Sequence, residues 1–235
     1  MSKVAVVIGG TGGIGRAIHQ EFLDNGIISI STSLHSATNA LDVRDDKKVL
    51  LFFRTISHID ICVYAVGIPF FGKVEKLFVR DLQGGFDLYV KGLFNVIKAV
   101  LPKMKVNRGR LIVIGGLRSF IPSQNKSVYC SMKAASTMLL SCLQEEVRQY
   151  GIQITTIHPG FTNTMFHKEN AKRPFEFVQG IWKEISITQP EDIAKIAYML
   201  TTLSLGAEMK EIQVGRAFNF YEKGLRLESC SEIKK

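Results

Sequence analysis

Short apolar runs alternate with helix-spaced apolar positions along most of the chain. Residues 3–9 form an apolar, β-branched run that ends in glycines, and residues 14–25 carry Ile18 and Phe22 at helical spacing before Asn25-Gly26. The same criteria predict further strands at residues 27–31, 41–43, 59–65, 110–114, 153–157 and 211–214. They also predict helices at residues 47–56, 82–104 and 127–150, and one that starts near residue 190.

This alternation predicts a single α/β domain. Apolar strands joined through helices pair in parallel with right-handed crossovers, which gives a doubly wound sheet of about seven strands with helices on both faces. We expect the domain to span residues 1–214 and residues 215–235 to form a C-terminal extension. Residues 161–188 lack clean periodicity and interrupt the pattern before its last helix.

Composition is that of an ordinary globular domain. The 235 residues are 46% hydrophobic and 22% charged, which suffices for a substantial core. No stretch approaches the roughly 18 apolar residues of a membrane span, and the apolar run near the N-terminus is too short for a signal-peptide core. The four cysteines show no CxxC spacing, so we expect free thiols, no metal and a cytoplasmic protein.

The formal net charge of +9 has a local origin between residues 88 and 144. That stretch contains nine basic residues and no acidic one: Lys91, Lys98, Lys103, Lys105, Arg108, Arg110, Arg118, Lys126 and Lys133. It is either a solvated face or a surface for an anionic substrate, a carrier protein or nucleic acid. The predicted topology places only Arg118 and Lys126 at the cleft, where they would hold a carboxylate or phosphate of a small substrate, and makes nucleic acid an unlikely partner.

A glycine loop follows the first strand and opens the first helix. Gly9, Gly13 and Gly15 occupy this position, with Thr11 and Ile14 between them. Missing side chains let backbone N–H groups and the positive helix end approach a pyrophosphate, and they permit close packing of helix on strand. The loop therefore predicts a dinucleotide site.

The end of the second strand bears on the choice of dinucleotide. An acid that binds the ribose is expected there, but the chain reads Ser31-Thr-Ser-Leu-His35. This segment contains no carboxylate that would repel a 2′-phosphate. The hydroxyls of Thr32 and Ser33 could donate to such a phosphate, and Arg16 or His35 could add positive charge. The sequence thus favours NADP over NAD, although no dedicated arginine follows the strand.

Tyr129 stands four residues before Lys133 within the predicted helix at 127–150. Residues at this spacing lie on one helix face, so the ammonium would approach the phenol and lower a pKa that starts near 10. Such a tyrosine is a proton donor that can work near neutral pH.

Four motifs in order give the chain its family resemblance. They are the glycine loop, Asp42-Val43, Tyr129-x-x-x-Lys133 and Pro159-Gly160 with Thr164 four residues later. Together they make residues 1–214 similar to a short-chain dehydrogenase/reductase. The resemblance implies a Rossmann-type domain that binds NAD(P), in which Tyr129 exchanges a proton with substrate oxygen and Lys133 supports it and holds the nicotinamide ribose.

The same resemblance assigns further positions. Asp42 and Val43 would line the adenine pocket, and Ala65 and Gly67 belong to the turn after the strand at 59–65. Thr162 and Thr164, after Pro159-Gly160, would contact the cofactor near the pyrophosphate and carboxamide. Residues 161–188 would form the substrate lid. The helices at 82–104 and 127–150 would pack in a homodimer or homotetramer.

Three customary polar positions of the family have changed. Gly116 replaces the catalytic serine, Tyr89 replaces the helix asparagine, and the asparagine-rich turn reads Tyr64-Ala65-Val66-Gly67. Ser119 lies only ten residues before Tyr129 and is the nearest substitute hydroxyl. Losing one preorganised donor slows a reaction about a hundredfold to a thousandfold.

Two hypotheses follow from these departures. One is an NADP-preferring oxidoreductase for a small carbonyl, hydroxyl or imine compound; the imine is suggested by similarity to dihydropteridine-reductase-like members, which also lack the serine. The alternative is a nucleotide-binding sensor or scaffold with little catalytic activity, which Gly116 and Tyr89 together would favour.

Overall fold

The computed structural model describes residues 2–168, 187–204 and 206–215. Within these ranges six strands form one parallel sheet in the order β2-β1-β3-β4-β5-β6. The strands are β1 Val4–Ile8, β2 Ile28–Thr32, β3 Ile61–Tyr64, β4 Arg110–Ile114, β5 Gln153–Pro159 and β6 Glu211–Val214. The α-helices are α1 Gly13–Asp24, α2 Asp46–Arg54, α3 Val79–Phe86, α4 Gly92–Asn107, α5 Ser127–Val147, α6 Met165–Lys168 and α8 Pro190–Thr202.

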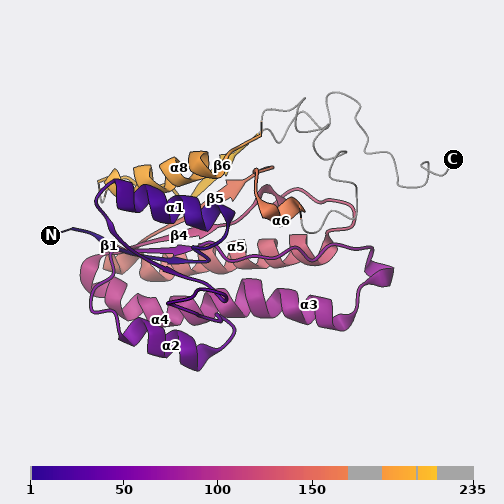
Figure 1. Ribbon diagram of the computed structural model, residues 1–235, viewed down its shortest axis with the longest axis horizontal. Coiled ribbons are helices and arrows are strands. Elements are labelled where there is room, and N and C mark those ends of the chain that lie inside the picture. The colour runs from indigo at the N-terminus through magenta and orange to yellow at the C-terminus, as the bar shows by residue number, and fades with distance from the viewer. Residues whose placement is uncertain (1, 169–186, 205, 216–235) are drawn as a thin grey trace.

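Helices cover both faces of the sheet (Figure 1), as the alternation of elements predicts. On one face Ile18 and Phe22 of α1 pack with Ile193 and Leu200 of α8 against the strands. On the other face the core is built from α2, α4 and α5, and it contains Phe53 from α2. The order of the strands reverses between β1 and β3, and a crevice for ligands opens at the carboxyl ends of such strands.

The strand predicted at residues 41–43 is a loop in the structure, so the predicted strand count is one too high for the described residues. Ala40 makes a single bridge to Ser33, and the Leu41 N–H donates to the Ser33 carbonyl at 2.9 Å. Leu41 and Val43 are nonetheless 4% and 3% exposed and belong to the core beside α2 and α4. Their apolar character therefore reflects a loop packed into the core, and the sheet has six strands within the described residues.

The helix predicted at residues 82–104 is present as α3 and α4 joined by a π-helical turn, Asp87–Lys91. A π-helical turn leaves backbone groups without their regular α-helical partners. The Tyr64 hydroxyl at the end of β3 donates to the Leu88 carbonyl in this turn at 2.8 Å. An added side chain at Gly92 would lie 3.0 Å from the same hydroxyl, so the glycine makes room for this contact.

The long helix that carries Tyr129 ends as expected. α5 runs over Ser127–Val147 and continues as a short 3-10 helix, after which Gly151 adopts a left-handed conformation with φ of +70°. Glycine adopts this conformation without steric cost and is the usual residue there. None of the helices in the described ranges is long and apolar enough to cross a membrane.

Candidate active site

The loop between β1 and α1 packs tightly against the end of β3. Gly9 has a left-handed φ of +83°, and an added Cβ there would lie 2.7 Å from the Ala65 carbonyl oxygen. An added Cβ at Gly15 would lie 2.2 Å from the Gly9 oxygen. Any larger residue at either position would force the backbone to move. These two glycines therefore let α1 start close to the neighbouring strands.

The start of α1 offers a site for an anion. The helix begins at Gly13, and the first N–H groups of a helix have no carbonyl partner within it. Thr11, Gly13 and Ile14 line the large cavity of the protein, so these groups lie at its wall. The positive end of the helix dipole adds to the attraction for negative charge. This part of the site fits the pyrophosphate of a dinucleotide.

The predicted hydroxyls at the end of β2 have different surroundings. The Thr11 hydroxyl donates to the Ser33 hydroxyl at 2.7 Å, which places both side chains at the edge of the glycine loop. The Thr32 side chain is fully buried and donates to the Asn39 carbonyl. Because this hydroxyl already has a partner inside the protein, the structure contradicts the prediction that Thr32 donates directly to a phosphate. Thr11 and Ser33 remain candidates.

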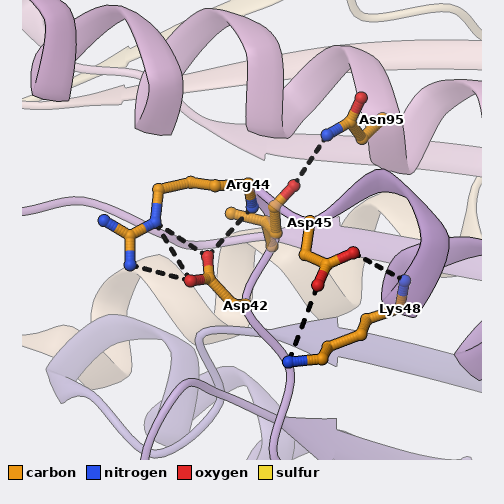
Figure 2. Close-up of polar contacts among 6 residues, drawn as sticks. Asp42, Arg44, Asp45, Lys48 and Asn95 are labelled. Carbon is orange, nitrogen blue, oxygen red and sulfur yellow. Dashed lines mark hydrogen bonds and ion pairs between the residues drawn. The ribbon is translucent and has the colours of Figure 1, made fainter.

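Asp42 and Val43 lie in the loop between β2 and α2, and Figure 2 shows the polar contacts of Asp42. Arg44 pairs with the Asp42 carboxylate through two nitrogens, the shortest distance being 2.7 Å. This hydrogen bond from Arg44 lowers the pKa of Asp42. The Asn95 side chain of α4 donates to the Val43 carbonyl at 3.0 Å, and Asp45 caps the start of α2. The loop therefore presents a fixed backbone, with the Val43 side chain in the core.

Tyr129 and Lys133 lie together on α5, as their spacing predicts. Tyr129 is 9% exposed, and Lys133 is 5% exposed. The Lys133 ammonium donates to the Ile114 carbonyl at 3.0 Å and lies 4.7 Å from the centre of the Tyr89 ring. Its distance from the centre of the Tyr129 ring is 5.9 Å. Lys133 is thus held between the end of β4 and Tyr89, with Tyr129 next to it.

Burial has opposite effects on the charges of these two groups. It raises the pKa of Tyr129 well above its ordinary value, and the nearby charge of Arg118 opposes this rise. It lowers the pKa of Lys133 to about 7. The predicted lowering of the tyrosine pKa is therefore absent in the protein by itself, because desolvation by burial dominates the pKa of Tyr129.

Gly116 lies directly opposite the Tyr129 hydroxyl. An added Cβ at Gly116 would lie 3.5 Å from this oxygen, so a serine there would bring its hydroxyl into the site. Ser119 does not replace it, because the Ser119 hydroxyl donates to the Lys133 carbonyl at 3.3 Å and accepts from the Thr137 hydroxyl at 3.1 Å. Both contacts direct Ser119 toward the α5 backbone.

One cavity of about 1090 Å³ joins the glycine loop, the turn after β3, the Tyr129 and Lys133 pair and the segment after β5. The predicted residues Gly9, Thr32, Ser33, Asp42 and Val43 are not on its wall. Predicted residues on its wall are Thr11, Gly13, Ile14, Gly15, Ala65, Gly67, Gly116, Arg118, Lys126, Tyr129, Lys133, Pro159, Gly160, Thr162 and Thr164. The cavity therefore brings the glycine loop and the tyrosine together, although they are more than a hundred residues apart in the sequence.

The segment after β5 closes one side of the cavity. Thr164 packs on the glycine loop, because an added Cβ at Gly13 would lie 2.6 Å from the Thr164 methyl carbon. Asn163 fixes this segment to the start of α8 through its side-chain contact with Gln189 at 3.0 Å. Thr162 is 3% exposed and pairs with Thr188. Most of the predicted lid, residues 161–188, lies outside the described residues, because 169–186 are not described.

Aromatic residues around Tyr129 are the part of the site that sequence reasoning missed. Phe71 and Phe166 lie 5.5 Å and 5.7 Å from the Tyr129 ring, centre to centre, and Tyr89 lies 5.7 Å away. The sequence marks Tyr89 only as the loss of an asparagine, and nothing in it distinguishes Phe71 or Phe166 from ordinary core residues. His158 was also missed: it is fully buried, packs against Phe120 with the two rings tilted by 60°, and contacts the Gly116 backbone at 3.3 Å.

Comparison with known proteins agrees with this geometry. The family model for short chain dehydrogenases matches residues 3–174. A protein described as a probable NADP-dependent dehydrogenase from Haemophilus influenzae is 28% identical over 229 residues, which cover 85% of this chain and 87% of that protein. An uncharacterized oxidoreductase of Staphylococcus epidermidis is 26% identical over 181 residues, covering 69% of this chain and 79% of the relative.

Among solved structures, the closed form of serine dehydrogenase complexed with NADP⁺ superposes with a TM-score of 0.81 at 23% identity. The match covers 90% of this chain and 94% of that one. At this identity the likeness concerns the fold, which is of the Rossmann type. Since the family model spans most of the sequence, the chain belongs to the short-chain dehydrogenase family and is related to its oxidoreductases.

Proposed function

We propose that the protein is an NADP-preferring oxidoreductase that acts on a small carbonyl, hydroxyl or imine compound. The observation that carries this proposal is the shared cavity, in which Tyr129 and Lys133 face the same space as the glycine loop. A dinucleotide whose pyrophosphate lies at the start of α1 would extend toward Tyr129. When bound, the nicotinamide supplies or accepts the hydride.

The residues that would hold the cofactor come from four segments. Gly9, Gly13 and Gly15 shape the loop that receives the pyrophosphate, and Ala65 and Gly67 follow β3 at the same crevice. Asp42 and Val43 would border the adenine, and Thr162 and Thr164, after Pro159 and Gly160, would contact the cofactor near the pyrophosphate and the carboxamide. Preference for NADP is supported by Thr11 and Ser33, by the absence of an acid at residues 31–35, and by the description of the Haemophilus relative.

Tyr129 would handle the proton. Burial raises its pKa, so the phenol holds its proton at neutral pH and would give it to a substrate oxygen or nitrogen only with help from a nearby positive charge that stabilises the phenolate. Lys133 would hold the ribose and, when protonated, would stabilise the phenolate that remains. Tyr89 and the Ile114 carbonyl keep the ammonium in place for both tasks.

A second candidate is a nucleotide-binding sensor or scaffold. Two observations favour it: Gly116 offers no hydroxyl opposite Tyr129, and the hydroxyl of Ser119 is used by α5. In this reading Lys133 is kept for ribose binding alone. Both candidates bind the cofactor, but only the oxidoreductase turns over a substrate.

Calorimetric titration with NADPH and NADH is the first test. Binding of NADPH more tightly than NADH supports the proposal, and binding of neither contradicts both candidates. A panel of carbonyl and imine compounds then separates them through oxidation of NADPH. Turnover that falls at least about a hundredfold in Tyr129→Phe, with the exposed Tyr150→Phe in the short 3-10 helix after α5 as the control, supports the enzyme. Tight binding without turnover supports the sensor.

We further expect a cytoplasmic homodimer or homotetramer assembled through α4 and α5, as the family resemblance implies. Large apolar side chains on these helices support this, since Phe94 is 46% and Met138 is 65% exposed in the single chain. The lid function of residues 161–188 and the role of residues 215–235 as an extension belong to the same proposal.

A further inference from the structure

Two basic side chains stand at the tyrosine end of the cavity. Arg118 follows β4 in a short 3-10 helix, Leu117–Ser119, and Lys126 immediately precedes α5. Both line the cavity wall together with Tyr129. The other basic residues of the stretch from 88 to 144, apart from Lys133, do not line it. The two residues thus form a distinct basic group inside the site.

Lys126 is placed to act on the same molecule as Tyr129. Tyr129 and Lys133 are four residues apart on α5, Lys126 immediately precedes this helix, and all three line the cavity. The Lys126 ammonium lies 4.7 Å from the centre of the Phe71 ring, and the Tyr129 ring lies 5.5 Å from that same centre. The Phe71 ring therefore lies next to both the Lys126 ammonium and the Tyr129 ring on the cavity wall.

No carboxylate in the described ranges pairs with Arg118 or Lys126. The acidic residue among the described ones on the cavity wall is Glu191 at the start of α8, and it forms no ion pair with either cation. Arg118 donates one long hydrogen bond, 3.4 Å, to the Pro122 carbonyl. Burial, and to a smaller extent the neighbouring charge of Arg118, lower the pKa of Lys126 to about 8. A bound anion would relieve this repulsion.

The walls next to the two cations are apolar. Phe71 and Phe166 pack on each other at 6.2 Å, centre to centre, and Ile121 lies on the same wall of the cavity. A largely apolar interior strengthens a charge interaction and favours a flat or apolar substrate body. The site therefore combines an apolar surface, a proton donor and a pair of cations within a short distance.

We propose that the substrate is an oxo or imino compound with a carboxylate or phosphate a few bonds from the reacting carbon, and that Arg118 and Lys126 bind this anionic group while Tyr129 faces the reacting atom. The inference rests on the proposed function and adds the substrate class. Arginine binds carboxylate and phosphate oxygens through its planar fork, and lysine adds a point charge.

Binding of benzoate, phenylphosphonate and benzamide tests the proposal without needing turnover. All three carry a phenyl ring, but only the first two carry an anionic group. Calorimetry is carried out with and without saturating NADPH. Benzoate and phenylphosphonate should bind about tenfold to a hundredfold more tightly than benzamide. The tighter of the two acids tells whether the site takes a carboxylate or a phosphate.

Variants locate the effect. Arg118→Gln and Lys126→Met should each weaken acid binding about tenfold and leave amide binding unchanged. Lys126→Arg should keep most of the acid preference. Lys98→Met, on α4 beside Phe94 and away from the cavity wall, is the matched control and should change nothing.

Failure of this inference is distinguishable from failure of the proposed function. Equal binding of acids and amide, binding of none of them, or acid binding that survives both variants overturns the anion site, whatever the cofactor result. Absence of NADPH and NADH binding counts against the proposed function, and the acid preference of the free protein still reports on Arg118 and Lys126.

Discussion

A side chain added at Gly116 would point at the hydroxyl of Tyr129. The built Cβ lies 3.5 Å from that oxygen, which is an ordinary van der Waals contact, and its next neighbour is the Pro159 carbonyl at 3.9 Å. Gly116 has a φ of 166°, an extended conformation that any residue adopts. The site therefore has room for the serine hydroxyl that the family resemblance predicts at this position.

Gly116→Ser should raise the rate of NADPH-dependent reduction by about tenfold or more at saturating substrate. The new hydroxyl would polarise the substrate oxygen that Tyr129 protonates, and removal of one such donor from other enzymes costs about a hundredfold to a thousandfold. Gly116→Ala is the control, because it adds the Cβ without the donor and should leave the rate unchanged. Turnover of the best compound from the panel measures both variants.

A serine variant no faster than the alanine variant would mean that substrate polarisation does not limit the reaction. The folded state should accept either change, since no backbone strain arises at this φ. Thermal unfolding of both variants checks this point, with midpoints expected within about 2 °C of the parent because unstrained substitutions cost little.

Tyr89 should act on Lys133 through its ring. The ring centre lies 4.7 Å from the ammonium, and the hydroxyl donates to the Ile68 carbonyl at 2.6 Å. Tyr89→Phe keeps the ring and loses about 1 kcal/mol from the hydrogen bond. Tyr89→Leu also loses the cation–π contact, worth about 2 kcal/mol when desolvated, and should be the less stable variant. Urea unfolding measures the difference, and equal stability of the two variants would contradict a role for the ring.

The exposed apolar residues of α4 and α5 predict the assembly state. Light scattering at micromolar concentration should give a dimer or tetramer, and Met138→Glu should shift it toward monomer, because a charge would be buried in the interface. Leu51→Glu is the control, since this side chain is 59% exposed on α2 at another part of the surface. A monomeric parent protein would contradict the prediction.

The parts of the site that follow from local rules are predictable from the sequence. The glycine loop is recognisable because its residues come right after an apolar strand and open a helix, and the structure brings it to the same cavity as Tyr129. The juxtaposition of Tyr129 and Lys133 follows from their spacing on one helix. The parallel sheet follows from alternation, because consecutive parallel strands require a crossover.

Residues 41–43 show where pattern reasoning fails. Leu41 and Val43 are apolar because they are buried, and a buried loop gives the same alternating signal as a strand. What decides between them is the partner: Ala40 bridges Ser33, and the chain then leaves the sheet toward Asn95 on α4. That contact joins residues 52 positions apart and has no local signature.

The electrostatic state of the site is also not predictable from spacing. Tyr129 and Lys133 are neighbours as expected, yet their pKa values depend on burial under Phe71, Tyr89 and Phe166. These aromatic residues come from three separate segments of the chain. Only the tertiary structure shows that desolvation by burial dominates both pKa values.

Lys133 should make the stability of the protein depend on pH. Burial lowers its pKa to about 7, whereas lysine in an unfolded chain titrates near 10.4. Between these values the unfolded chain binds the extra proton, so this residue makes stability rise with pH by about 1.4 kcal/mol per unit. Below about pH 7 both states are protonated, and the cost of the buried charge is constant and largest.

Lys133→Met should therefore be more stable than the parent near pH 7, and its advantage should shrink as the pH rises toward about 10. Urea unfolding at several pH values from about 6 to about 10 measures this difference in stability. Lys98→Met, which replaces an exposed lysine of α4, should show no such dependence on pH. Lys126, whose pKa burial lowers to about 8, titrates in parent and variant alike and cancels in the comparison. A difference that stays constant with pH would mean that Lys133 keeps an ordinary pKa. Its positive charge would then be available to lower the pKa of Tyr129.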